Sequence, residues 1–338
     1  MAYESADLLR LVQVEHTDEV AALEDGITTA GVGSADRSLK RLIEATLTAW
    51  TRAFGGPNRP ATAGDLLRRL LAAARAAVRR ILGALGPRAT AALTGAVEDA
   101  VTLGAQQGAA FMAAATGRRL RVPAIPQPSR NLRAEAARLA NMVTERRDRA
   151  LHMLASGNVS RWSHVLAGLG AARAAVSLSR GHIAWVTAAA VAEGLDAVAR
   201  SAGTLRLWVA EADACVRCLA YSGLIVQQDE SFPGGLSWDP RQRRLRAAGV
   251  PGPPLHQHCR CRTVPWSNRW PAVGIAFPEA LRREAERSIG YGRARPSEST
   301  TVRIRAAREL LRTVDDLLPA VQTVARTAVR NGRFPAAA

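Results

Sequence analysis

The residues best suited to chemistry are four cysteines and two histidines that fall between positions 215 and 261. Cys215 and Cys218 form a C-x2-C pair, and residues 256–261 follow with H-x2-C and C-x-C spacings. A C-x2-C pair lets two thiolates face one ion across a tight turn, and a second short pair can complete a tetrahedron of sulfur and nitrogen ligands around Zn²⁺. Because cytosolic thiols are kept reduced, clustered cysteines in such a chain indicate a metal site before they indicate disulfides.

One tetrahedral ion needs four of these six side chains. The set that we expect is Cys215, Cys218, His256 and Cys259. Cys261 is the spare thiol and could replace Cys259, and His258 is less favoured because it is directly beside Cys259. A zinc ion with four protein ligands is closed and structural, and it would pin the two ends of the 227–254 loop. Two other interpretations stay open, a disulfide or redox-labile pair and cysteines buried as small apolar side chains.

The sequence gives little support for an enzyme. A zinc deaminase needs H-x-E and P-C-x2-C, but no histidine has a glutamate two residues on, and Ala214 precedes Cys215. The H-E-x-x-H pair of zincins and the G-x-S-x-G elbow are also missing from the sequence. A histidine–metal nuclease would find only Asp229, Glu230 and Asp239 near its histidines. We therefore expect no catalytic centre, with a zinc-dependent hydrolase as the weaker alternative.

The segments around the cysteines have the pattern of short strands. Residues 205–209 alternate and carry large side chains, and residues 224–226 and 262–264 form two shorter strand-like runs. Between the last two runs, residues 227–254 are rich in Gly, Pro, Asp and Arg. A loop of that length is usually functional or is fixed by a contact outside it. One metal ion bound by residues at both ends of the loop would be such a contact.

The rest of the chain has helical periodicity. The apolar residues of 39–50 recur at i, i+3 and i+4, and Gly55-Gly56-Pro57 predicts the end of that helix. A further helix begins at Asp65 and is expected to end at Gly86-Pro87, followed by an alanine-rich helix over 89–115. Residues 131–155, 158–178 and 182–202 predict three more helices, with Gly181 as a weak break.

These patterns predict a mainly α fold, with helical bundle regions and a small α+β Cys/His knuckle domain of short strands. We expect four consecutive segments: an N-terminal helical region over 1–121, a Pro-rich linker over 122–130, a knuckle domain over 131–270 and a basic helical C-terminal tail over 271–338. The tail is expected to be peripheral and to contain one amphipathic helix over about 300–330.

The charge balance is strongly basic. The net charge is +17, and one lysine stands against 45 arginines. Codon bias explains arginine over lysine but does not explain the basic excess, which would concentrate anions such as double-stranded DNA around the protein. The clearest basic cluster within the loop consists of Arg241, Arg243, Arg244 and Arg246. The first residues are acidic and no stretch reaches about 18 uncharged apolar residues, so we expect a soluble chain with no membrane partner.

The knuckle residues resemble the signature of the phage Mu F-like head-morphogenesis family. That signature is a strand, an Asp-containing turn with C-x2-C, a glycine turn, and a loop closing on a Pro-rich H-x-x-C-R-C. The residues that carry the resemblance are Trp208, Asp213, Cys215, Cys218, Gly223, Phe232-Pro233, Pro253-Pro254, His256 and Cys259-Arg260-Cys261. The resemblance covers about 130–270. It departs from the family at Gln257, where a proline is common, and at the basic insert 241–246.

The resemblance implies a minor capsid protein of a tailed phage or prophage, present in few copies at the portal vertex of the virion head. Its implied role is procapsid assembly in the host cytoplasm, and its implied partners are the portal protein, other head proteins and DNA bound without sequence preference. The alternative from a different class is a zinc-knuckle DNA-binding regulator. Against that alternative, no predicted helix directly follows the knuckle to read a DNA groove.

Overall fold

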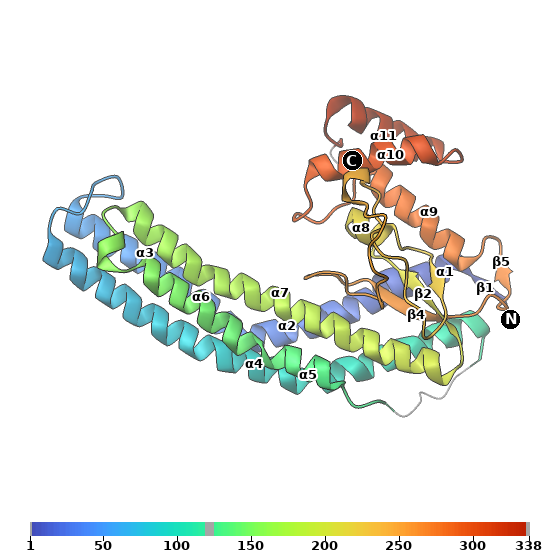
Figure 1. Cartoon of the computed structure of the whole chain (residues 1–338), viewed down its shortest axis with the longest axis horizontal. Helices are drawn as coiled ribbons and strands as arrows, with labels where there is room; N and C mark the ends of the chain where they lie inside the picture. Colours follow the sequence, from blue (N-terminus) through green and yellow to red (C-terminus); the bar gives the residue numbers. More distant parts are fainter. Residues whose placement is uncertain (1, 119–124, 336–338) are drawn as a thin grey trace. The chain divides into compact units, whose positions relative to one another are not determined.

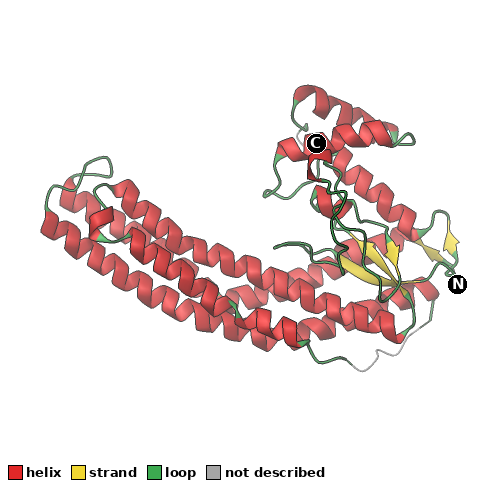
Figure 2. Ribbon diagram, viewed as in Figure 1, coloured by secondary structure: helices red, strands yellow, loops and turns green. Residues whose placement is uncertain are grey.

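The computed structural model describes residues 2–118 and 125–335 of the chain. Helices dominate it and the strands are few and short, so the expected fold class is confirmed (Figure 2). Residues 122–124 of the predicted Pro-rich linker lie outside the described part, whereas residues 125–129 are described and carry no helix or strand.

The chain divides into two compact units, each made of segments that are distant in sequence. The first, which we call the mixed unit, combines Met1–Ala21, Glu98–Gln127 and Ala188–Ala338. The second, which we call the helical unit, combines Ala22–Val97 and Pro128–Thr187. These units differ from the four consecutive segments that the sequence predicts, because three long helices each contribute residues to both units.

The helical unit is built from amphipathic helices. Its elements, including those shared with the mixed unit, are α2 (His16–Gly31), α3 (Gly33–Phe54), α4 (Gly64–Thr116), α5 (Arg130–Ala137), α6 (Leu139–Met153), a short 3-10 turn (Ser156–Asn158) and α7 (Trp162–Ser201). Helix α3 ends where predicted: Gly55 has a left-handed φ of 82°, and its N–H bonds to the carbonyl of Thr51 at 2.8 Å. Beside this cap, the Trp50 ring packs on Phe54 and Trp162 with centroids 4.6 and 6.1 Å away.

Two predicted helix breaks are wrong. Helix α4 runs straight through Gly86-Pro87, and α7 runs through Gly181. A proline inside a helix costs about 3 kcal/mol, because it loses one hydrogen bond and crowds the carbonyl four residues earlier. Pro87 faces solvent, while Leu82, Leu85 and Ala89 are buried on either side of it, so packing outweighs the local cost.

The mixed unit contains a three-stranded antiparallel sheet in the order β3-β2-β4. Its strands are β2 (Leu205–Val209), β3 (Ile225–Val226) and β4 (Arg262–Trp266), at the three places that the sequence predicts. In the central strand, Leu207 and Val209 belong to one buried cluster and Trp208 belongs to another. Because side chains alternate along a strand, the sheet has a hydrophobic core on each face.

The first face is covered by segments from both ends of the mixed unit. Strand β1 (Tyr3–Glu4) pairs in parallel with β5 (Ala272–Val273), and the chain continues into α1 (Ser5–Arg10) and a π-helical turn (Leu11–Glu15). Tyr3 is buried in the same cluster as Val264 and Phe277, and its ring meets that of Trp266 edge-on at 5.8 Å. This parallel pairing joins positions far apart in sequence and has no signal in the sequence pattern.

The second face is covered by the C-terminal helices α9 (Phe277–Gly290), α10 (Thr300–Thr313) and α11 (Pro319–Asn331) (Figure 1). Ile289, Leu310 and Val321, one from each helix, are buried in one cluster with Trp208 and Cys218. The C-terminal helices therefore contribute buried residues to the core, and the expectation of a peripheral tail is wrong. The single helix predicted over 300–330 is two helices, because α10 ends at Thr313 and Pro319 starts α11.

Candidate metal centre

The C-x2-C pair is placed by a short turn after strand β2. Residues 210–215 leave the strand, and Cys215 caps the one-turn helix α8 (Val216–Leu219). The single helical turn between the two cysteines puts their side chains on the same side of the chain. Cys218 is buried, and Cys215 is half-buried.

Strand pairing brings the second segment to the first. In the antiparallel ladder, Val209 at the end of β2 lies opposite Arg262 at the start of β4. Residues 256–261 therefore arrive at the sheet end from which residues 210–218 leave. Both cysteines of this segment, Cys259 and Cys261, are buried.

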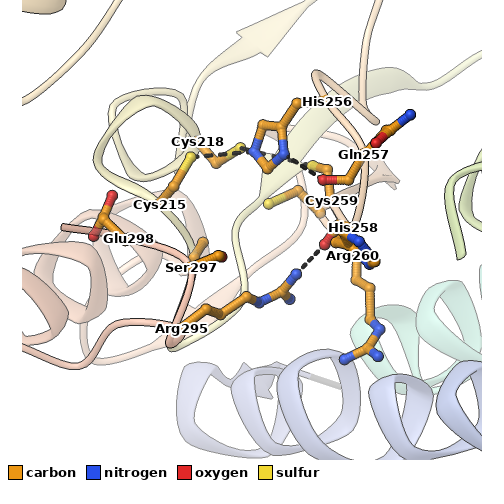
Figure 3. A pocket seen from close by; sticks show the side chains of 12 residues that line it. Cys215, Cys218, His256, Gln257, His258, Cys259, Arg260, Arg295, Ser297 and Glu298 are labelled. Carbon is orange, nitrogen blue, oxygen red and sulfur yellow. Dashed lines mark hydrogen bonds between the residues drawn. The ribbon is translucent and has the colours of Figure 1, made fainter. Parts of the chain in front are cut away.

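The donor atoms of the two segments converge in a small cavity of about 60 Å³ (Figure 3). Nε2 of His256 lies 3.2 Å from Sγ of Cys215 and 3.4 Å from Sγ of Cys218. Sγ of Cys218 lies 3.6 Å from Sγ of Cys259. Two groups could each hold a metal ion, Cys215 with Cys218 and His256, and Cys218 with Cys259 and Cys261.

These separations match the edges of a zinc tetrahedron. With Zn–S bonds of about 2.3 Å and Zn–N bonds of about 2.1 Å, neighbouring ligand atoms should lie roughly 3.5–3.8 Å apart. The Sγ–Sγ separation lies within that range, the two Nε2–Sγ separations are slightly shorter, and Cys218 belongs to both groups. All four cysteines are free of disulfides. The donors thus form two groups of three that share Cys218, and within each group all ligand atoms lie within 4.8 Å of one another.

The two histidines differ in their suitability as metal ligands. Nδ1 of His256 donates to the carbonyl of Gln257 at 2.7 Å, which leaves Nε2 directed at the sulfurs. A carbonyl acceptor on the second ring nitrogen is the usual support for a metal-bound histidine. His258 has a left-handed φ of 61° and belongs to neither donor group. Burial, together with nearby Arg260 and His256, lowers the pKa of His258.

The cluster lowers the pKa of two of its cysteines and raises the pKa of the other two. Hydrogen bonding from Cys218, with further help from His256, lowers the pKa of Cys215 to about 4 despite burial. The hydrogen bond with Cys215 in turn raises the pKa of His256 to about 9. Hydrogen bonds from Cys218 and Cys261 lower the pKa of Cys259. Hydrogen bonds with Cys215 and Cys259 raise the pKa of Cys218. The hydrogen bond with Cys218 lowers the pKa of Cys261, but the hydrogen bond with Cys259 and burial outweigh it and raise that pKa. Thiolate is the form of cysteine that binds metal, so the fold already stabilises the ligand form at Cys215 and Cys259.

Three residues of the cavity wall, Arg295, Ser297 and Glu298, come from the segment between α9 and α10. Sequence reasoning missed them, because they follow the last cysteine by more than thirty residues in a region expected to be peripheral. Neither their spacing nor their type marks them as neighbours of the cysteines. Only the packing of α9 and α10 on the sheet brings them there.

The four arginines of the basic insert have different environments. Arg243 pairs with Glu309 at 2.8 Å and donates to the carbonyl of Ser237 at 2.8 Å, so it holds the loop to α10. Arg241, Arg244 and Arg246 are exposed, and so is Leu245 between the last two. The insert is also folded back tightly, since a Cβ at Gly235 would lie 2.2 Å from the carbonyl oxygen of Arg244.

Across the described residues, none of the helices has the length and apolarity needed to span a bilayer. The chain matches no family model, no curated protein and no solved structure.

Proposed function

We propose that this chain holds one structural zinc ion in its Cys/His cluster and serves as a minor head protein of a tailed phage or prophage, of the phage Mu F-like type. The observation that carries the proposal is the convergence of the C-x2-C pair with the H-x2-C-R-C segment on one cavity. These are the motifs on which the resemblance to that family rests. Their convergence would allow both motifs to provide ligands to the same ion.

Zinc is the ion that best suits the donors. Three sulfurs with one imidazole nitrogen favour Zn²⁺ over the hard cations, which prefer oxygen. The ligands would be Cys215, Cys218, His256 through Nε2, and Cys259, with Cys261 as the replacement for Cys259. Four protein ligands leave no open position for a substrate, so the ion would support the fold rather than a reaction.

The ion would stabilise the mixed unit by joining two chain segments. Residues 210–218 and 256–261 enclose the irregular loop between β3 and β4, which has few backbone hydrogen bonds of its own. Free energy of metal binding becomes free energy of folding when the site does not exist in the unfolded chain. The loop and its exposed arginines would thus be presented in a fixed conformation to a partner.

The partners that we propose are the portal protein, other head proteins and double-stranded DNA bound without sequence preference. The charge of +17 and the exposed arginines of the insert support contact with a polyanion. The localisation that follows is the portal vertex inside the virion head, after assembly in the host cytoplasm. A zinc-dependent hydrolase is less well supported, because four protein ligands would leave no open position on the ion.

The test is co-expression with the portal and major capsid proteins encoded by the same phage or prophage. We expect the chain to sediment with procapsids in a density gradient, at few copies per particle by quantitative mass spectrometry. Particles assembled without the portal protein are the control and should lack the chain. Sedimentation of all of the chain as free protein, with the portal present, would refute the head-protein role.

A further inference from the structure

One guanidinium joins the two halves of the candidate metal centre. Arg295 pairs with Glu211 and lies 3.3 Å from the carboxylate of Asp213, both on the turn that leads to Cys215. It also donates to the carbonyl of His258, between His256 and Cys259 (Figure 3). That carbonyl belongs to a residue in the left-handed conformation, which few non-glycine residues adopt without outside support. Arg295 therefore connects the first ligand segment to the second without being a ligand.

Two further side chains from the same region hold the peptide groups on both sides of Cys215. A carboxylate oxygen of Glu298 accepts the backbone N–H of Val216 at 2.9 Å. Arg303 donates to the carbonyl of Ala214 at 2.8 Å and pairs with Glu298. Cys215 is the least buried of the four cysteines, so these contacts fix the backbone of the ligand that core packing holds least.

Arg303 is an unusual residue for a structural contact alone. It is 1% exposed, and its Nε and Nη1 atoms are buried without a hydrogen-bond partner among the described residues. Leaving buried donors of a charged group unpaired is costly. The cost is reduced when an anion lies nearby, and the Glu298 carboxylate pairs with this guanidinium.

We propose that Arg295, Glu298 and Arg303, which we call the 295–303 clamp, are positioning residues that set how tightly and how long the chain holds its zinc ion. This inference rests on the proposed zinc centre and goes beyond it, because it assigns metal retention to residues outside both cysteine motifs. The clamp acts by holding the backbone on both sides of Cys215 and at His258. Outer partners of metal ligands typically change metal affinity 10- to 100-fold when they are removed.

The experiment measures zinc binding to the full-length chain by competition with a chromophoric chelator, together with the rate of zinc release. We expect Arg295→Met and Glu298→Ala each to weaken zinc affinity 10- to 100-fold and to speed release. Glu298→Gln keeps an oxygen that can accept the Val216 N–H, so it should recover most of the affinity. The matched control is Arg293→Met, in the same loop, because Arg293 pairs with Glu284 and packs on Tyr291, away from the ligand segments.

A second readout separates positioning from stability. Co²⁺ replaces zinc in tetrahedral sites, and its visible absorption bands report ligand geometry in protein that circular dichroism shows to be folded. The bands should shift in Arg295→Met and stay unchanged in Arg293→Met. Affinity, release rate and Co²⁺ bands in Arg295→Met that equal those of Arg293→Met would overturn the clamp and leave the zinc centre standing. A wild-type chain that binds no zinc would overturn both.

Discussion

The two compact units are specified by different kinds of interaction. The helical unit is formed by helices whose apolar residues recur every three or four positions, and its buried charged residues are few, with Glu24 and Asp36 as the main examples. The mixed unit combines three separate stretches of chain and buries Arg206, Asp239, Arg262 and Arg303. Local periodicity predicts the helices of the first unit, although not that α4 and α7 continue through Pro87 and Gly181. The second depends on contacts between positions that are distant in sequence, and on a cluster suited to a metal.

The largest effect should come from the cysteine shared by both donor groups. Cys218→Ser replaces a buried thiol that contacts both His256 and Cys259. We expect the chain to lose its zinc and the mixed unit to lose several kilocalories per mole of stability, because structural zinc binding contributes on the order of 10 kcal/mol to folding in small domains. Metal analysis by mass spectrometry and thermal unfolding measure the two effects.

The comparison variant is Cys261→Ser, which removes the thiol expected to be spare. Zinc content near that of the wild type in this variant would support Cys259 as the fourth ligand. Loss of zinc from Cys261→Ser with retention in Cys259→Ser would reverse the assignment. If Cys218→Ser changes neither the metal content nor the melting curve, the cluster holds no metal and the mixed unit is stabilised by packing alone.

A smaller effect on stability is expected when either of two glycines in helix α4 is replaced by alanine. The two glycines belong to different units. A Cβ at Gly104, in the mixed unit, would lie 2.0 Å from the carbonyl oxygen of Val191 in α7. Gly104→Ala should therefore cost about 1–3 kcal/mol or more, because the helices must separate. Gly95, in the helical unit, has nothing within 4 Å of such a Cβ.

Gly95→Ala should therefore raise the free energy of unfolding by about 0.5–1 kcal/mol, since alanine is the better helix former. Urea denaturation of the two variants gives both values. Equal and small effects at both positions would show that the α4–α7 approach at Gly104 is looser than described.

The smallest effect concerns DNA and asks which unit contacts it. Each phosphate contact contributes about 0.9 to the slope of log affinity against log salt. Arg244→Gln with Arg246→Gln should lower that slope by about 2 if the insert binds DNA. Arg79→Gln with Arg80→Gln, two exposed arginines of the helical unit, should leave the slope unchanged. The reverse result would move the DNA contact to the helical unit.

Arg243 is unsuitable for this test, although the sequence groups it with its neighbours. Its ion pair with Glu309 holds the insert to α10, so its replacement would disturb the fold. The sequence shows a run of basic residues but not which of them is already paired. That distinction depends on Glu309, which lies more than sixty residues later in the chain.

Contacts between distant residues also limit how much of the fold the sequence predicts. The three strands of the sheet and the end of α3 at Gly55 follow from local patterns, because alternation and helix caps are properties of short segments. Pro87 and Gly181 mislead, because the packing of neighbouring residues outweighs their local preference. The role of the C-terminal helices is not visible locally, because Ile289, Leu310 and Val321 become core residues only against Trp208 and Cys218.

The candidate site, like the fold, is predicted only in part by the sequence. Cysteine and histidine spacing predicts the donors, because the spacing itself places two ligands on one turn. The clamp residues have no such spacing. Arg295 and Glu298 reach the cluster only through the fold of α9 and α10, which places their segment beside the turn at Cys215.

The pairing of β1 with β5 has a consequence for the order of events during protein synthesis. Tyr3 leaves the ribosome well before its partner Ala272, which is made 269 residues later. At 5–20 residues per second, the early strand waits roughly 15 to 50 s for its partner. The helical unit needs no residue beyond Thr187, so it can be complete during that interval. Until residues 264–281 are made, Leu8 and Val12 lack their cluster partners Val264, Trp266, Phe277 and Leu281, and an apolar surface of this kind favours aggregation of the growing chain.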